Sequence, residues 1–292
     1  MRSLVVAVAQ VRCVPLDPEK NAAITVERIR EAAARGAQLV VLPELVATGY
    51  EPAAPGLASL AESVREPGPC LTAWTSVAAE LGVAVVGGFV EREDDRLYNS
   101  AVIIDTDGSV LAVYRKLHLF GGERDVFTPG DHGLPLVEVL GASVGIGVCY
   151  DLRFPEVLRI LAVRGAELVV VPTAWVSGFD RRPPADGRIG QVDGALVQSN
   201  LNQLFLACAD QVGSSGDTVF LGRSVVTDPY GQAVVGPLSA DDEDLVVVSL
   251  DLDQVEQARH RGPGIDPMAN RRTDVYADLL GYREPTTEGG GE

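Results

Sequence analysis

The stretch RGAQLVVLPE, from Arg35 to Glu44, decides the fold, and RGAELVVVPT, from Arg164 to Thr173, repeats it 129 residues later. Each copy has the signature of a helix end, a glycine stop and a strand that is apolar at every position. Such strands are typical of sheets covered on both faces. We expect two related halves of one sandwich. The alternative is that any turn from a helix into a buried strand favours Arg-Gly-Ala.

The same alternation continues outward along the chain and predicts an α/β protein. Asp-Gly and Pro-x-Gly turns near Gly108 and Gly231 add antiparallel hairpins, so the sheets should be mixed. The expected strands are Leu4–Ala9, Gln38–Leu42, Val83–Val90, Ser100–Asp105, Val110–Tyr114, Ser143–Val148, Glu167–Val171, Leu204–Ala209, Arg223–Asp228 and Leu245–Leu250. The expected helices are Glu19–Arg35, Leu71–Leu81, Pro155–Arg164, Gln191–Asn202 and Leu252–His260.

Length and composition predict one folded domain. The chain has 292 residues, of which 46% are hydrophobic and 22% charged, and this is too apolar for a disordered protein. No Ser/Gly linker interrupts residues 3–282, so we expect a single domain over residues 1–283. The tail, residues 284–292, lacks apolar anchors and is expected to be disordered.

Charge and cysteine usage exclude several classes of function. The formal net charge of −17 repels phosphate backbones and anionic lipid surfaces, so no nucleic acid or membrane partner is expected. The longest uncharged stretch, Gly194 to Ala209, is interrupted by amides and hydroxyls and predicts no transmembrane helix. The N-terminus lacks a signal-peptide cleavage pattern and is interpreted as a first strand. Four scattered cysteines fit neither a disulfide scaffold nor a zinc site and favour a cytoplasmic protein.

Three reactive side chains each follow a buried run: Glu44, Lys116 and Cys149. In α/β sheets, reactive groups gather beyond the carboxyl ends of strands, so these three could converge. A nearby ammonium favours a thiolate and stabilises an oxyanion, while a carboxylate can take the thiol proton and later activate water. Taken singly, each has an ordinary structural explanation as a buried thiol, a surface lysine or a loop acid. Together they predict a nucleophilic thiol site.

Cys149 lies in GIGVCYDLRFPE, from Gly145 to Glu156, with a strand before it and a helix expected from Pro155. This pattern predicts a strand-to-helix elbow that lifts the sulfur above the sheet. The elbow would also turn the backbone amides of Tyr150 and Asp151 toward the atom under attack.

Three motifs carry a resemblance to a known family: PEL at Pro43–Leu45, YRKLHLF at Tyr114–Phe120 and GVCYDLRFPE at Gly147–Glu156. They resemble the nitrilase superfamily of carbon–nitrogen hydrolases. The similarity covers almost the whole chain and includes FTPGD at Phe127–Asp131 and GRSVVTDPYG at Gly222–Gly231. The resemblance implies an α/β fold, an αββα sandwich with mixed sheets and internal pseudo-symmetry.

The resemblance also implies a site and a reaction. Its triad would be Glu44, Lys116 and Cys149, with Glu123 as the second glutamate after the lysine, although Glu123 could be a loop acid. Cys149 would attack a small linear carboxamide, Glu44 would pass a proton to the departing ammonia, and water would hydrolyse the thioester. Lys116 and the backbone amide of Tyr150 would hold the oxyanion. No step asks for a metal or an organic cofactor, and a homodimer or larger homo-oligomer is implied.

The motif CYDLRF resembles the branch with omega-amidases and deaminated-glutathione amidases, whose substrates carry a carboxylate. Arg153 is then a candidate carboxylate contact, or alternatively a salt bridge that fixes the elbow. Tyr50 and Trp175, with Phe179 and Arg181, are further pocket candidates, although Trp175 could simply pack in the core. The helix Gln191–Asn202 lacks the Ala-Arg-Ala motif of that branch and leaves the substrate open.

Three other functions remain as alternatives. An N-carbamoyl amine hydrolase of the same superfamily has a related elbow. A non-catalytic relative would bind small molecules in the same pocket, but would not need the complete triad. A nucleotide-binding α/β protein would need a Gly-rich phosphate loop, which GASVGIG, from Gly141 to Gly147, does not provide.

Overall fold

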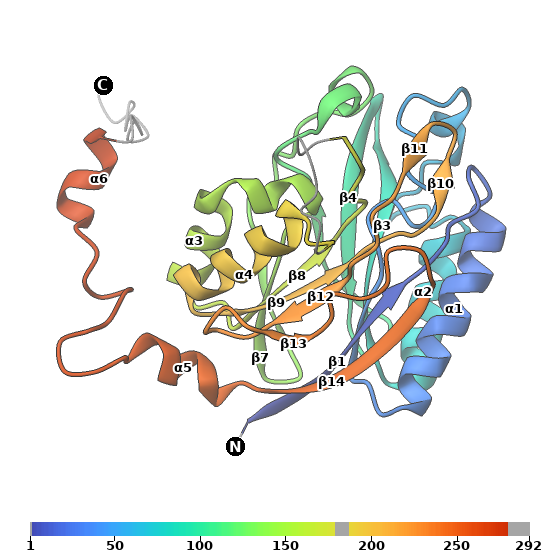
Figure 1. Cartoon of the computed structure of the whole chain (residues 1–292). Helices are drawn as coiled ribbons and strands as arrows, with labels where there is room; N and C mark the ends of the chain where they lie inside the picture. Colours follow the sequence, from blue (N-terminus) through green and yellow to red (C-terminus); the bar gives the residue numbers. More distant parts are fainter. Residues whose placement is uncertain (1, 179–186, 280–292) are drawn as a thin grey trace, which may run out of the picture.

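Two six-stranded mixed sheets form the centre of the protein in a computed structural model that describes residues 2–178 and 187–279. The first sheet has the strand order β14-β1-β2-β3-β4-β5 and the second the order β13-β12-β9-β8-β7-β6 (Figure 1). The strands of the first sheet are β1 (Ser3–Gln10), β2 (Leu39–Val41), β3 (Ala84–Glu93), β4 (Arg96–Ile104), β5 (Val110–Arg115) and β14 (Asp244–Asp251). Those of the second are β6 (Leu136–Val139), β7 (Ala142–Ile146), β8 (Leu168–Pro172), β9 (Phe205–Ala209), β12 (Val225–Thr227) and β13 (Ala233–Val235).

The two sheets repeat one pattern of strand pairing. In the first, β1 pairs parallel with β2 and β2 with β3, after which β4 and β5 follow antiparallel. In the second, β7, β8 and β9 are parallel, and β12 and β13 follow antiparallel. One antiparallel edge strand, β14 or β6, completes each sheet. The sequence echo therefore reflects the predicted pseudo-symmetry, because β2 and β8 hold equivalent places.

Helices cover the outer face of each sheet and complete an αββα sandwich. Helices α1 (Pro18–Ala34) and α2 (Pro69–Leu81) pack on the first sheet through residues such as Ile29 and Trp74. Helices α3 (Pro155–Val163) and α4 (Gly190–Asn202) pack on the second sheet. The inner faces of the two sheets share one buried core. The runs of β2 and β8 are buried at every position, as their uniformly apolar sequences predict.

Several elements of the structure were not predicted from the sequence. They are the edge strands β6 and β13, the short hairpin β10 (Ser214–Ser215) with β11 (Thr218–Val219), the helix α6 (Thr273–Leu279) and three 3₁₀ turns, η1 (Leu57–Leu60), η2 (Gly121–Asp125) and η3 (Cys149–Arg153). The expected strand Ser143–Val148 ends earlier, at Ile146, because the chain must leave the sheet before it enters η3. Helix α5 (Asp253–Arg259) lies where a helix was expected, and α6 lies apart from the sandwich in Figure 1. The expected tail 284–292 lies outside the described residues.

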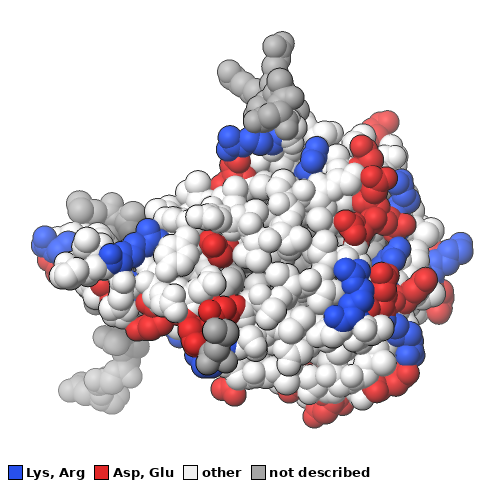
Figure 2. All heavy atoms as spheres, turned by 60° about the horizontal axis from the view of Figure 1, so that its bottom comes forward, with Lys and Arg blue, Asp and Glu red and all other residues white. Residues whose placement is uncertain are grey.

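One face of the described surface carries few charged side chains at its centre (Figure 2). In the face shown in Figure 2, acidic and basic side chains surround a broad uncharged centre. None of the helices in residues 2–178 and 187–279 has the length and apolar character needed to cross a membrane.

Candidate active site

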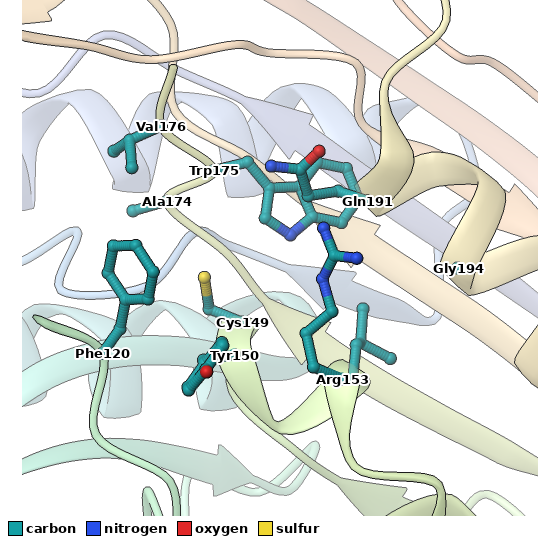
Figure 3. Close-up of a pocket in the computed structure, with 10 residues that line it drawn as sticks. Phe120, Cys149, Tyr150, Arg153, Ala174, Trp175, Val176, Gln191 and Gly194 are labelled. Carbon is teal, nitrogen blue, oxygen red and sulfur yellow. The ribbon is translucent and has the colours of Figure 1, made fainter. Parts of the chain in front are cut away.

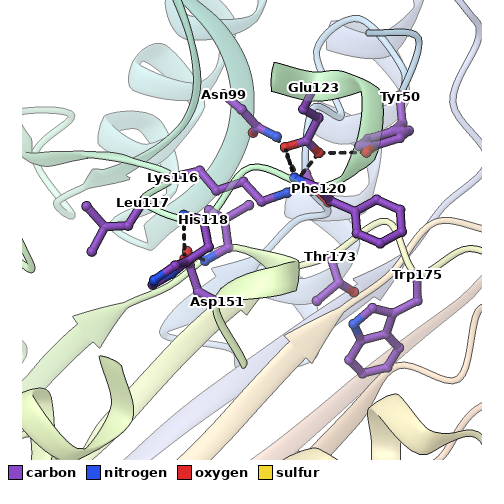
Figure 4. Close-up of polar contacts among 12 residues, drawn as sticks. Tyr50, Asn99, Lys116, Leu117, His118, Phe120, Glu123, Asp151, Thr173 and Trp175 are labelled. Carbon is purple, nitrogen blue, oxygen red and sulfur yellow. Dashed lines mark hydrogen bonds and ion pairs between the residues drawn. The ribbon is translucent and has the colours of Figure 1, made fainter. Parts of the chain in front are cut away.

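A lysine and two glutamates form a buried cluster between the two sheets. Lys116 Nζ lies 2.7 Å from Glu44 Oε1 and 2.8 Å from Glu123 Oε1, and all three side chains are inaccessible to solvent. Asn99 donates to Glu44 Oε1 at 2.7 Å. The Tyr50 hydroxyl donates to Glu123 Oε1 at 2.6 Å (Figure 4). Complete burial excludes the interpretations of Lys116 as a surface lysine and of Glu123 as an ordinary loop acid.

Close backbone packing fixes Glu44 just beyond the end of β2. A Cβ atom on Gly88 of β3 would lie 2.4 Å from the Leu45 amide nitrogen and 2.7 Å from the Glu44 Cα atom. Only glycine therefore lets β3 approach this segment so closely. The Glu44 amide donates to the Thr173 carbonyl, and Gln211 donates to the Glu44 carbonyl at 2.7 Å. The segment is thus held from both sheets.

Lys116 is held by the segment FTPGD. Its amide donates to the Asn99 carbonyl at 2.8 Å, and its carbonyl accepts from the Gly130 amide at 2.9 Å. A Cβ atom on Gly130 would lie 2.0 Å from the Arg115 carbonyl oxygen, so this position also requires glycine. The Arg115 side chain, 1% exposed, pairs with Asp131 at 2.9 Å and with Glu91 at 2.7 Å. These contacts fix the backbone on both sides of the lysine.

Cys149 begins the η3 turn in a strained backbone conformation. Its φ is +45°, a left-handed value that is rare for a residue other than glycine and is found at nucleophile elbows. The helix α3 begins at Pro155, as predicted. Strain of this kind, of order 1–3 kcal/mol, persists only where surrounding contacts enforce it.

Asp151 supplies the enforcing contacts and links the elbow to the lysine segment. Its carboxylate accepts from the Val148 amide at 2.9 Å and from the Tyr114 hydroxyl at 2.7 Å. It also contacts the His118 amide at 3.2 Å and the His118 ring Nδ1 at 2.8 Å. The His118 ring in turn stacks on Phe154, with centroids 3.5 Å apart. One buried carboxylate therefore joins the residues that flank Lys116 to the residues that flank Cys149.

Burial and neighbouring charges shift the pKa values within the site. Burial raises the pKa of the Cys149 thiol well above its usual range, and the Glu44 carboxylate raises it further, while Lys116 lowers it. Burial also raises the pKa of Glu44, against the opposing effect of Lys116. Burial lowers the pKa of Lys116, but the Glu44 and Glu123 carboxylates more than offset this and raise it. The resting site therefore combines a neutral thiol, a charged lysine and a carboxyl that holds its proton more readily than usual.

The Cys149 side chain opens into a largely apolar pocket (Figure 3). The predicted residues Tyr150, Arg153 and Trp175 line this pocket with the thiol. Trp175 is 3% exposed and also packs in the core of the second sheet, so both interpretations of it hold. The remaining lining residues are Phe120, Leu152, Ala174, Val176, Gln191 and Gly194.

Several predicted residues lie elsewhere, and others were missed. Tyr50 does not line this pocket; it contacts Glu123 and lines a neighbouring one. Phe179 and Arg181 lie outside the described residues. Asn99 and His118 were not predicted from the sequence. His118 is two residues after Lys116 in the motif YRKLHLF, but only the fold brings it to Asp151.

An αββα sandwich that gathers a cysteine, a lysine and two glutamates defines the class of nitrilase-type thiol hydrolases. The family model for carbon–nitrogen hydrolases matches residues 5–260. The chain is similar to a nitrilase of Pyrococcus abyssi, with 34% identity over 93% of this chain and 99% of that protein. It is also similar to the N-carbamoylputrescine amidase of Oryza sativa subsp. japonica, with 32% identity over 94% of each chain.

A solved structure of an amidase from Nesterenkonia sp. superposes with a TM-score of 0.80, with 29% identity over 95% of this chain and 96% of that one. In another structure of that amidase, acrylamide has added to the active-site cysteine. The chain belongs to the carbon–nitrogen hydrolase family, within the nitrilase superfamily. Membership confirms the predicted fold and the predicted class, a hydrolase of carbon–nitrogen bonds other than peptide bonds.

Proposed function

We propose that this protein hydrolyses a small linear carboxamide through a thioester on Cys149, with release of ammonia. The observation that carries the proposal is the convergence of Glu44, Lys116 and Glu123 in one buried cluster whose charges act on the Cys149 thiol. The amidase relatives support the same reaction. The omega-amidase branch stays a prediction of the sequence motif.

Glu44 acts as the general base in this mechanism. Because the thiol is neutral at rest, attack requires proton removal as the sulfur approaches the amide carbon. Glu44 Oε1 is occupied by Lys116 and Asn99, whereas Oε2 has no hydrogen-bond partner among the described residues. Oε2 therefore takes the proton from sulfur and delivers it to the departing ammonia. In the second half, it takes a proton from the water that attacks the thioester and returns this proton to the Cys149 sulfur as the acid leaves.

Lys116 and the backbone amide of Tyr150 stabilise the oxyanion. The raised pKa of Lys116 keeps the ammonium charged throughout the cycle, and its burial strengthens its interaction with the developing negative charge. Glu123, like Glu44, accepts a hydrogen bond from Lys116 and is itself held by Tyr50. We assign Glu123 the role of orienting the ammonium.

Ammonia release by the wild type and by Cys149→Ala tests this proposal. The panel contains aliphatic amides, omega-amides, N-carbamoyl amines and nitriles. We expect turnover of at least one amide by the wild type and none by Cys149→Ala, whose circular dichroism spectrum should match that of the wild type. Equal turnover by both proteins, or none by the wild type on any amide, contradicts the proposal.

Hydrolysis of an N-carbamoyl amine is the second candidate, and the relatives named N-carbamoylputrescine amidase favour it. The charge of the pocket favours a carboxamide instead. Arg153 lines the pocket around Cys149, and none of its described lining residues is a carboxylate. The distal ammonium of a carbamoylated diamine would therefore lack a counter-ion there. The ratio of kcat/KM for a carboxamide to that for N-carbamoylputrescine distinguishes the two candidates.

Three further predictions from the sequence belong with this proposal. We propose one domain over residues 1–283, a cytoplasmic location and a homodimer or larger homo-oligomer. All four cysteines are free of disulfides, which supports a reducing compartment. Exposed apolar side chains on α3 and α4 support self-association: Ile160, Val163, Val197 and Leu201 are each about half exposed.

A further inference from the structure

Gln191, in the first turn of α4, carries a buried polar atom that has no partner in the described part of the chain. Its side chain lines the pocket around Cys149, and the residue is 9% exposed. Its Oε1 atom has no hydrogen-bond partner among the described residues. Buried polar groups are nearly always paired, and an unpaired one costs about 1–3 kcal/mol. Figure 3 shows the Gln191 amide and the Cys149 sulfur in the same pocket.

Gly194 lies one turn further along the same helix and lines the same pocket. It has no left-handed φ, and a Cβ atom placed on it would meet no described atom within 4 Å outside the backbone of its own helix. Glycine inside a helix costs about 0.5–1 kcal/mol relative to alanine, so the fold gains nothing from glycine here. The missing side chain instead leaves space in the pocket beside Gln191.

The helix is fixed against the elbow, so this space does not depend on a movement of α4. Gln198 of α4 donates to the Leu152 carbonyl in η3 at 3.4 Å. The apolar wall of this pocket includes the side chains of Phe120, Leu152 and Trp175. An apolar chain bound to Cys149 could pass along this wall and reach the glutamine amide.

We infer that Gln191 and Gly194 form a distal subsite for the acyl part of the substrate. This inference rests on the proposed function. Gly194 gives the acyl chain room, and the Gln191 amide pairs with a group at the end of that chain. Because a primary amide both accepts and donates hydrogen bonds, its best partner is an uncharged group that does the same. The substrate class is a carboxamide whose acyl chain ends in a hydroxyl or a second carboxamide.

The experiment compares five amides of one chain length: hexanamide, its terminal hydroxyl derivative, the corresponding diamide, the corresponding monoacid and the terminal amine. A site that hydrogen-bonds its substrate discriminates strongly against an analogue without that group. We expect kcat/KM for the hydroxyl and diamide compounds to exceed that for hexanamide by at least about tenfold. Gln191→Leu should reduce this ratio to about one.

A second variant tests the space, and a third serves as a control. Gly194→Leu should lower the ratio of kcat/KM for hexanamide to that for propionamide, because its side chain fills the pocket. Asp94→Asn changes an exposed residue in the β3–β4 turn, outside this pocket, and should leave both ratios unaltered. Circular dichroism of each variant verifies that the helix is intact.

Failure of this inference can be told apart from failure of the proposed function. The dissociation constants of the five amides are also measured on Cys149→Ala by calorimetry, so the test does not depend on turnover. A ratio near one in the wild type, or a preference that survives in Gln191→Leu, overturns the subsite. Preference for the monoacid that is lost in Arg153→Gln also overturns it and assigns the end of the pocket to Arg153. Lack of turnover on every amide refutes the proposed function instead.

Discussion

Replacement of Asp151 tests whether one carboxylate fixes the position of the Cys149 thiol relative to Lys116. Asp151 is 1% exposed and accepts from Tyr114, Val148 and His118. Asp151→Ala would leave the Tyr114 hydroxyl and the Val148 amide buried without an acceptor. Each buried donor without an acceptor costs about 1–3 kcal/mol, so the free energy of unfolding should fall by about 2–6 kcal/mol. His118, with a side chain 30% exposed, can regain its hydrogen bond from water.

Asp151→Asn separates positioning from stability. It keeps the shape of the side chain but directs an NH₂ group at donors that formerly met an oxygen, which should cost about 1–3 kcal/mol. A relaxed elbow should move the sulfur relative to Lys116, and a displacement of about 1 Å lowers kcat by about 10²-fold. We expect kcat to fall while KM changes little, because the pocket walls stay in place.

The assays are urea unfolding and steady-state ammonia release, with Tyr114→Phe and Asp94→Asn alongside. Tyr114→Phe removes one donor together with its need for an acceptor, so it should cost only about 0.5–1.5 kcal/mol. Asp94 is exposed in the β3–β4 turn, and its Asn variant controls for the loss of one charge. Wild-type kcat in Asp151→Asn would refute the argument that this carboxylate sets the geometry of the site.

Four more predictions follow from the structure. Gly88→Ala should lower kcat by about 10²-fold in the ammonia assay, because its Cβ atom would collide with the backbone at Glu44; an unaltered rate would contradict this. Burial raises the pKa of Glu44. As the pH is lowered, kcat/KM should therefore begin to fall at a pH above about 4.3, the usual pKa of glutamate. Asn99→Ala removes a hydrogen bond that lowers this pKa and should move the acid limb of the pH–rate profile to higher pH; a shift to lower pH would exclude Glu44 as the base. Ile160→Glu with Val197→Glu should lower the molar mass measured by light scattering after size-exclusion chromatography, and an unchanged mass would place any interface elsewhere.

The sequence predicted the sheets and the reactive residues because both leave local signals. Buried strands such as β2 and β8 are apolar at every position, and Glu44 and Cys149 follow such runs directly. The edge strand β13 has an exposed or half-exposed residue at each position and thus gives no comparable signal. The β10–β11 hairpin has only two residues in each strand, too few for any periodicity to appear.

The polar contacts around the site were less predictable, because they join residues that are distant in the sequence. Asn99 is 55 residues from Glu44, and His118 is 33 residues from Asp151. Both partners are polar residues on or after strands, and nothing local distinguishes them from solvated ones. From the sequence, Gln191 was predicted only to begin a helix that departs from the family pattern. Its importance emerges only when the fold places it in the pocket of Cys149.

The two pseudo-symmetric halves contribute different residues to this site. Glu44 and Thr173 are equivalent positions in the sequence echo, and the Glu44 amide donates to the Thr173 carbonyl where the two halves meet. In the first half this position supplies a carboxylate next to Lys116. In the second half Thr173 donates to the Ala209 carbonyl and to Asp210 and so holds the backbone. Cys149 comes from the second half, while Glu44 and Lys116 come from the first. Neither half alone can therefore assemble the thiol, the proposed base and the ammonium, and the proposed mechanism requires a stable interface between the sheets.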